Sequence, residues 1–197
     1  MKAKKTKIID SYQGYDLYGF TDEEILLDDF EYRDDLIFED IRVSACKVIE
    51  TMTAKGLTLS VCESITGGAL ASSLVSVSGA SKVFSEGLVT YSNESKIKRL
   101  GVKRETIEKY GAVSYAVARE MATGLRGNCD YSVSTTGIAG PNGDGFCNKI
   151  GAVFIGVSSK NETVVKGFEF EGTREEIRKN SVRAALSMLL NALIISK

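Results

Sequence analysis

The sequence predicts a three-layer α/β/α domain built around a mixed, mostly parallel sheet. Strand-like and helix-like apolar patterns alternate along most of the chain. A polar turn with two glycines follows the first strand pattern, at Glu63–Gly68, and a short turn at Lys160-Asn161 separates two later strands. The alternation is typical of parallel strands joined by helices, and the short turn requires one antiparallel pair.

The first half of the domain is predicted from apolar spacing and from residues that end helices. Apolar positions recur at helical spacing between 37 and 54, and Gly56 can end that helix. Alternating Leu57, Leu59 and Val61 indicate a strand that leads into the polar turn. The next elements expected are a helix marked by residues 70–75, a strand over 84–91, and short helices from 93 and over 104–110.

Capping residues define the second half. Ser114 can cap a longer helix, and Thr173 with Glu176 forms a capping box for a final helix that runs through Ile194. Between these helices we expect a strand over 131–136, a glycine-rich loop over 137–149, and two antiparallel strands over 150–158 and 163–170.

The composition indicates a globular protein and argues against several classes. The 197 residues are 43% hydrophobic and 26% charged, with four cysteines and no histidine. No apolar run approaches the roughly 20 residues of a membrane span, and the basic N-terminus lacks the apolar stretch of a secretion signal. The cysteines show neither a C-x-x-C pair nor metal-like spacing. We therefore expect reduced thiols, no metal and a cytoplasmic location.

Charge divides the chain into two parts. Residues 1–40 carry five basic and twelve acidic residues, which leaves 20 basic and 14 acidic residues for the remainder. We expect residues 1–36 to form an acidic extension that docks on the body or on a neighbouring subunit, because aromatic residues interleave the acids. A partly ordered tail is the alternative. The domain expected over 37–197 is mildly basic, which favours a small anionic ligand over nucleic acid or a membrane.

Three polar loops follow three predicted strands, at Glu63–Gly68, Tyr91–Lys96 and Thr135–Gly143. Such loops meet at one edge of the sheet if their strands are parallel. In the first loop Ser64 and Thr66 supply hydroxyls, and the glycines allow backbone amides to approach a ligand.

A serine nucleophile in this chain needs a base other than histidine. Lys96 is the best candidate base for Ser64, provided that burial or a nearby cation lowers its pKa. Tyr91 would relay a proton or hold the lysine in place. A solvated surface lysine is the alternative interpretation. Cys62 is a rival nucleophile, although a thiol among apolar residues more often serves packing.

The third loop and Glu63 each have two interpretations or more. Gly137 and Gly140 permit close backbone approach and Pro141 stiffens the loop, so its amides can bind a phosphate or an oxyanion; a structural turn is the alternative. Glu63 orients Lys96, binds a ribose hydroxyl or accepts backbone hydrogen bonds at the turn, and the residues leave this choice open.

The three loops, with the motifs E-S-I-T-G-G, V-T-Y-S-N-E-S-K and T-G-I-A-G-P-N-G, together resemble the CinA C-terminal domain family, the nicotinamide-nucleotide amidohydrolases often called PncC. The likeness extends through E-G-T-R-E-E-I-R at Glu171–Arg178 and covers about residues 37–197. It implies an α/β/α fold with a mixed sheet. It also implies metal-independent hydrolysis of the carboxamide of nicotinamide mononucleotide to nicotinate mononucleotide and ammonia, without a cofactor, by a homo-oligomer.

The resemblance also assigns roles to residues. It implies that Ser64 is the nucleophile and that Lys96 is its base, with Tyr91 beside them. The residues expected to bind substrate are Glu63, Thr66, Gly67, Gly68, Asn93, Thr136, Gly137 and Gly140.

The chain departs from the family pattern at three places. Ile65 replaces a frequent cysteine, Asp144 replaces a glycine, and Asn148-Lys149 stands where Lys-Pro is common. These departures leave open a non-catalytic nucleotide-binding or regulatory module of the same fold.

Overall fold

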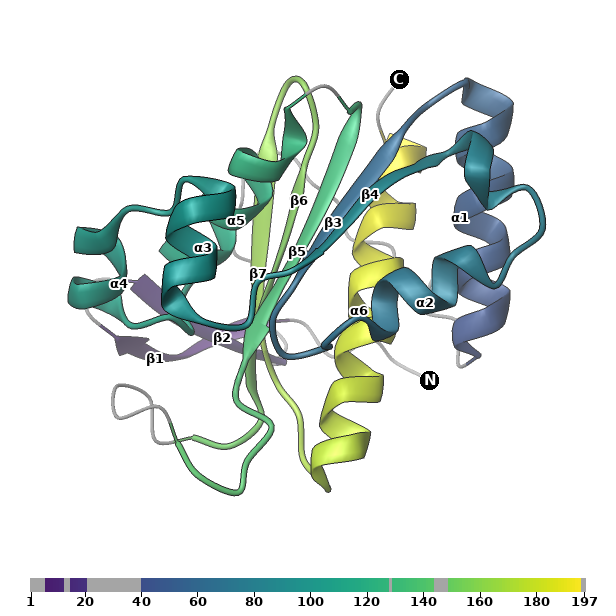
Figure 1. Cartoon of the computed structure of the whole chain (residues 1–197). Coiled ribbons are helices and arrows are strands. Elements are labelled where there is room, and N and C mark those ends of the chain that lie inside the picture. The colour runs from purple at the N-terminus through teal and green to yellow at the C-terminus, as the bar shows by residue number, and fades with distance from the viewer. Residues whose placement is uncertain (1–5, 13–14, 21–39, 128, 144–148, 196–197) are drawn as a thin grey trace.

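The computed structural model describes residues 6–12, 15–20, 40–127, 129–143 and 149–195. Its centre is a five-stranded sheet with the strand order β4-β3-β5-β6-β7 (Figure 1). The strands are β3 (Leu59–Glu63), β4 (Phe84–Val89), β5 (Tyr131–Gly137), β6 (Ala152–Ser158) and β7 (Thr163–Glu169).

The strand directions match the predicted mixed sheet. β3 is parallel to both β4 and β5, whereas β6 is antiparallel to β5 and to β7. β6 therefore runs against the other strands of this sheet, which is mixed and mostly parallel in strand direction. Because β3, β4 and β5 are parallel neighbours, the loops after them leave the sheet at the same edge.

Helices cover both faces of the sheet, which confirms the three-layer architecture (Figure 1). One layer holds α1 (Ile41–Lys55), α2 (Ala69–Val75) and α6 (Arg174–Ile195). The other holds α3 (Asn93–Leu100), α4 (Arg104–Tyr110) and α5 (Tyr115–Arg126). A single 3-10 turn, η2 (Ala80–Lys82), precedes β4 in the described part of the chain and was not predicted.

The helix ends follow the capping signals. Gly56 ends α1 in the left-handed conformation, with φ of 64°. Ser92 caps α3 by accepting from the Ser95 amide, and Ser114 caps α5. At the start of α6, Glu176 accepts from the Thr173 amide while the Thr173 hydroxyl accepts from the Glu176 amide. This reciprocal pair is the predicted capping box.

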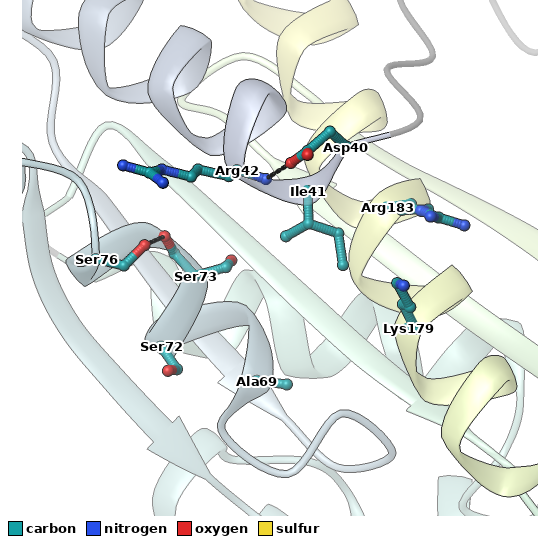
Figure 2. Close-up of a pocket in the computed structure, with 9 residues that line it drawn as sticks. All are labelled: Asp40, Ile41, Arg42, Ala69, Ser72, Ser73, Ser76, Lys179 and Arg183. Atoms are coloured by element: carbon teal, nitrogen blue, oxygen red, sulfur yellow. Dashed lines mark hydrogen bonds between the residues drawn. The ribbon is translucent and has the colours of Figure 1, made fainter.

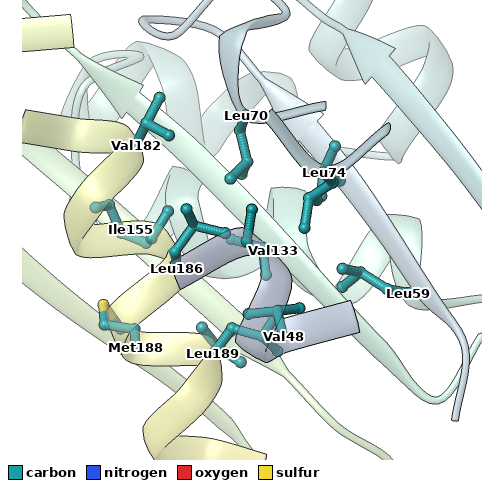
Figure 3. Packing of buried hydrophobic residues seen from close by; sticks show 14 of the residues in the cluster. Val48, Leu59, Leu70, Leu74, Val133, Ile155, Val182, Leu186, Met188 and Leu189 are labelled. Carbon is teal, nitrogen blue, oxygen red and sulfur yellow. The ribbon is translucent and has the colours of Figure 1, made fainter. Parts of the chain in front are cut away.

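The largest core cluster lies between the sheet and the layer of α1, α2 and α6. Val133 and Ile155 project from the central strands into this layer, where they meet Val48, Leu70 and Leu186 from the three helices (Figure 3). All five side chains are buried. Burial of each such side chain contributes about 1.5–3 kcal/mol, so this layer supplies much of the stability that holds the loops in place.

The opposite face of β5 is lined with serines that bind the backbone of α5. Ser132 donates to the carbonyl of Ala122 at 2.6 Å, and Ser134 donates to that of Ala118 at 2.7 Å. A Cβ at Gly156 would lie 2.9 Å from the same Ala118 carbonyl. Small residues here let α5 pack directly on the sheet.

An antiparallel hairpin, β1 (Thr6–Tyr12) and β2 (Tyr15–Phe20), belongs to the predicted N-terminal extension. β2 contacts β7, so this part of the extension lies against the domain. The remaining residues of the extension lie outside the described ranges. None of the described helices is long and apolar enough to span a membrane.

Candidate active site

The three predicted loops meet at one cavity of about 220 Å³ beyond the ends of β3, β4 and β5. Most of the residues predicted to act on or bind a substrate line this cavity. They are Ser64, Tyr91, Asn93, Lys96, Thr136, Gly137 and Gly140.

Ser64 and Lys96 form the centre of the site. Lys96 Nζ lies 3.1 Å from Ser64 Oγ, although the two residues are 32 positions apart in the chain. The lysine comes from the first turns of α3 and is only 1% exposed, while Ser64 is 8% exposed. The structure thus excludes the alternative of a solvated surface lysine.

Backbone carbonyls orient the amine of Lys96. Its Nζ donates to the carbonyl of Thr90 at 2.9 Å and to that of Tyr91 at 3.3 Å. A neutral amine has two N–H bonds and one lone pair. In the ammonium form Nζ also donates to Ser64 Oγ. In the neutral form, with both N–H bonds directed at the carbonyls, the lone pair is left for the Ser64 hydroxyl, as a proton acceptor requires.

Burial also changes the proton affinity of this amine. It lowers the pKa of Lys96 from 10.5 to about 8, because the charged form loses its hydration. No carboxylate of the described residues forms a salt bridge with Lys96 to oppose this effect. A measurable fraction of Lys96 is therefore neutral near pH 7 and can accept a proton from a serine hydroxyl.

Tyr91 holds Lys96 through its backbone and not through its phenol. The ring is 63% exposed, and its hydroxyl accepts a hydrogen bond from Arg174 Nη2 at 3.2 Å. The Tyr91 carbonyl contacts Lys96, as a positioning role requires, whereas the phenol contacts Arg174 and not Lys96.

The prediction that Glu63 binds substrate is wrong. Its side chain is fully buried, and its carboxylate accepts from the backbone amides of Gly68, Leu70 and Ala71 at 2.8–3.1 Å. Glu63 therefore caps the N-terminus of α2, which was one of the three alternatives left open by the sequence. Its position behind the turn follows from its place as the last residue of β3.

Three further residues of the first loop turn away from the cavity. The Thr66 hydroxyl is buried against that of Thr135 at 2.7 Å, and the Gly68 amide is bonded to Glu63. Thr66, Gly67 and Gly68 do not line the cavity, so the structure does not bring these three predicted binding residues to it. The glycines instead form the turn itself, with φ of 58° at Gly67 and 95° at Gly68.

The third loop forms the opposite wall. The Thr136 hydroxyl donates to the Ala112 carbonyl at 2.8 Å, which ties this loop to the segment before α5. Gly137 has no room for a side chain, because a Cβ there would lie 2.8 Å from both the Ala152 carbonyl and the Ile65 side chain. Gly140 has φ of 79°, which is also unfavourable for other residues.

Cys62 is not a nucleophile in this arrangement. It is completely buried on the α5 side of β3, where its Sγ donates to the carbonyl of Met121 at 3.4 Å. Burial raises the pKa of the thiol well above its usual range. The packing interpretation of Cys62 therefore holds. Among the described residues no cluster of carboxylates and thiols could hold a metal ion.

The sequence model of the protein family described as the CinA C-terminal domain matches residues 42–193 of this chain. The chain belongs to this family. A CinA-like protein from Fusobacterium nucleatum is 45% identical over 177 residues, covering 90% of this chain and 41% of that protein. A CinA-like protein from Kosmotoga olearia is 45% identical over 149 residues, covering 75% of this chain and 36% of that protein. The chain thus spans well under half the length of these relatives.

Solved structures of CinA proteins share the fold. The competence/damage inducible protein CihA from Agrobacterium tumefaciens has a TM-score of 0.76 and 37% identity, covering 80% of this chain and 98% of that one. A CinA superfamily protein from Escherichia coli has a TM-score of 0.78 and 30% identity, covering 86% and 99%. The family and fold expected from the loop motifs are thereby confirmed.

Two arginines of α6 belong to this CinA-family site, and sequence reasoning missed them. Arg174 lines the cavity and donates to the Gly140 carbonyl at 2.7 Å as well as to the Tyr91 hydroxyl, so it joins the second and third loops. Arg178 donates to the carbonyl of Ile65 at 3.2 Å, beside the serine. The resemblance of the segment Glu171–Arg178 to the family could have pointed to both arginines, because both lie in it.

Proposed function

We propose that this protein hydrolyses the carboxamide of nicotinamide mononucleotide to nicotinate mononucleotide and ammonia. The observation that carries the proposal is the buried pair of Ser64 and Lys96, with 3.1 Å between oxygen and nitrogen and a lowered lysine pKa. An amide is a poor electrophile, so its hydrolysis needs an activated nucleophile and an acid for the leaving nitrogen. The pair supplies both.

The reaction proceeds in two halves. Neutral Lys96 accepts the proton of the Ser64 hydroxyl as Oγ attacks the carboxamide carbon. The resulting ammonium form of Lys96 gives that proton to the leaving nitrogen, so that ammonia departs and an ester to Ser64 remains. Water then attacks the ester with Lys96 again as base, which releases the carboxylate product and restores the serine.

Donors near the serine support the negative oxygen that forms during attack. Ile65 lines the cavity directly after Ser64, and its backbone amide makes no hydrogen bond within the described residues. We assign this amide to the oxyanion. The Gly68 amide, which the sequence placed near a ligand, is bonded to Glu63 instead. Arg174 on the rim of the same cavity is suited to the substrate phosphate, because its planar guanidinium binds oxyanions through paired donors.

The decisive measurement is ammonia release from nicotinamide mononucleotide. Wild type should release ammonia, and Ser64→Ala and Lys96→Ala should each lose at least about a thousandfold in kcat. Lys98→Ala is the matched control, because Lys98 lies on the same helix and is exposed. The double variant Ser64→Ala/Lys96→Ala should be no slower than either single variant, since both residues serve one step.

The same assay separates the enzyme from a non-catalytic module of this fold. Full activity in Ser64→Ala would refute the mechanism. Binding of nicotinamide mononucleotide by wild type without any turnover would refute the activity and favour the binding or regulatory module.

A further inference from the structure

A second cavity, of about 680 Å³, opens between the start of α1, helix α2 and the middle of α6. It shares no lining residue with the Ser64 cavity. Figure 2 shows Ile41 between two polar walls, with Arg42 extending along α2 on one side and Lys179 and Arg183 on α6 on the other. Exposed Arg42 and Lys179 and the half-buried Arg183 therefore line a cavity whose apolar residues are Ile41 and Ala69.

The positive charge of this cavity is uncompensated within the described residues. Arg42, Lys179 and Arg183 form no salt bridge there. Asp40 is the one carboxylate among the residues lining the cavity, and it accepts from the Arg42 amide at 2.7 Å as the cap of α1. Gathering like charges without counter-charges costs free energy, which an anion bound among them would recover.

Unused donor groups point to the same kind of ligand. Arg183 Nη1 donates to Asn180 Oδ1 at 3.1 Å, but its Nε is buried with no hydrogen-bond partner in the described part of the chain. The Ser72 hydroxyl on α2 lines the same cavity, is exposed, and makes no hydrogen bond with another described residue. Because that Nε has almost no accessible surface, an anion in the cavity meets Arg183 through its Nη groups.

We propose that this cavity binds a phosphate-bearing anion. Phosphate offers several acceptor oxygens and a charge that matches two arginines and a lysine. The half-buried Ile41 gives the cavity an apolar surface as well, on which the organic part of a phosphate ester such as a nucleotide can rest. The ligand chemistry is a phosphate group, supplied either by a free polyphosphate or by a nucleotide.

Isothermal titration calorimetry of the full chain with pyrophosphate and with ATP tests the site. Arg42→Gln/Lys179→Gln should weaken binding of the probe at least about tenfold, because it removes two charge-assisted contacts to the anion. The matched control is Lys47→Gln/Lys160→Gln, which removes the same charge from exposed residues outside the cavity and should bind like wild type.

The two probes distinguish the sources. Equal binding of pyrophosphate and ATP indicates that phosphate groups suffice, and tighter binding of ATP indicates a contact between the nucleoside and Ile41; both support the proposal. Absence of binding by both probes, or equal affinity in the cavity variant and its control, would overturn it. Binding that is lost in Arg174→Gln instead would place the phosphate in the Ser64 cavity and would also overturn it.

Thermal melting in phosphate-free buffer provides a second, independent outcome. If Arg42 and Lys179 are uncompensated, their replacement relieves repulsion, and the variant should melt at the same temperature as the Lys47→Gln/Lys160→Gln control or higher. A lower melting temperature than the control would show that these cations are already compensated in the folded protein, which would refute a free anion site.

Discussion

Replacing Lys96 with methionine should stabilise the fold while abolishing activity. Burial lowers the pKa of this amine from 10.5 to about 8. At pH 7 the lysine is charged in both the folded and the unfolded state, and the folded state carries a penalty on the order of 3 kcal/mol. Methionine has a similar shape and no charge, so Lys96→Met removes this penalty.

The net gain is smaller than the penalty, because methionine also loses hydrogen bonds. Lys96 Nζ contacts two carbonyls and Ser64 Oγ. The Tyr91 carbonyl is part-buried and Ser64 lines the cavity, so water can replace the amine at both, whereas leaving the buried Thr90 carbonyl without a partner costs about 1–2 kcal/mol. We therefore expect Lys96→Met to raise the free energy of unfolding by about 1–2 kcal/mol at pH 7, or the melting temperature by several degrees. Exposed Lys98→Met on the same helix should change stability by less than about 0.5 kcal/mol.

The pH dependence of the free energy of unfolding tests whether the charge of buried Lys96 is the cause of this difference. Above pH 8 the folded protein loses the proton of Lys96 while the unfolded chain keeps it until about 10.5. Wild-type stability therefore gains from Lys96 as pH rises through this window, and the advantage of Lys96→Met should shrink over the same range. Urea unfolding of wild type, Lys96→Met and Lys98→Met at pH 7 and at pH 9.5 measures this. A constant difference, or a methionine variant less stable than wild type at pH 7, would refute the reasoning.

The remaining predictions concern catalysis, the turn and the extension. The kcat/KM for nicotinamide mononucleotide should rise about tenfold per pH unit below pH 8 and then level off, since neutral Lys96 is the active form; an inflection near 10.5 would contradict this. Glu63→Gln should lower the free energy of unfolding by about 2 kcal/mol in urea titrations, because an amide cannot accept from all three backbone amides, whereas exposed Glu86→Gln should be neutral. Deleting residues 1–36 should lower the melting temperature or change the oligomer mass in light scattering, because β2 contacts β7; an unchanged protein by both measures would show that the extension is a free tail.

The pairing of Ser64 with Lys96 could be anticipated because alternatives were few. With no histidine in the chain, a serine nucleophile leaves lysine as the main candidate base, and both residues follow strands of one sheet. The role of Glu63 could not be decided in the same way. Three roles were compatible with a carboxylate at the end of a strand, and the course of the backbone into α2 selected the capping role.

The sequence also could not show which residues of distant segments reach the site. Arg174 reaches the cavity only because α6 packs beside the turn after β3, and no local pattern around residue 174 indicates a contact with Gly140 or Tyr91. The phenol of Tyr91 illustrates the reverse case. Because Tyr91 lies close to Lys96 in the motif, a contact between the two side chains was expected. The structure instead has the Tyr91 backbone carbonyl in contact with Lys96 Nζ.

The sequence alone determined the order and type of the helices and strands from α1 to α6, several of their caps and the family of this protein, but neither the β1–β2 hairpin nor η2. These features depend on interactions within a few residues, as for the capping box of Thr173 and Glu176. Only the tertiary structure decided that Lys96 is buried against Ser64, that the Glu63 side chain is buried, and that Arg42 and Lys179 line one cavity. Pairing of β3 with β4 and packing of α1, α2 and α6 bring these groups together, and both depend on contacts between residues far apart in the chain.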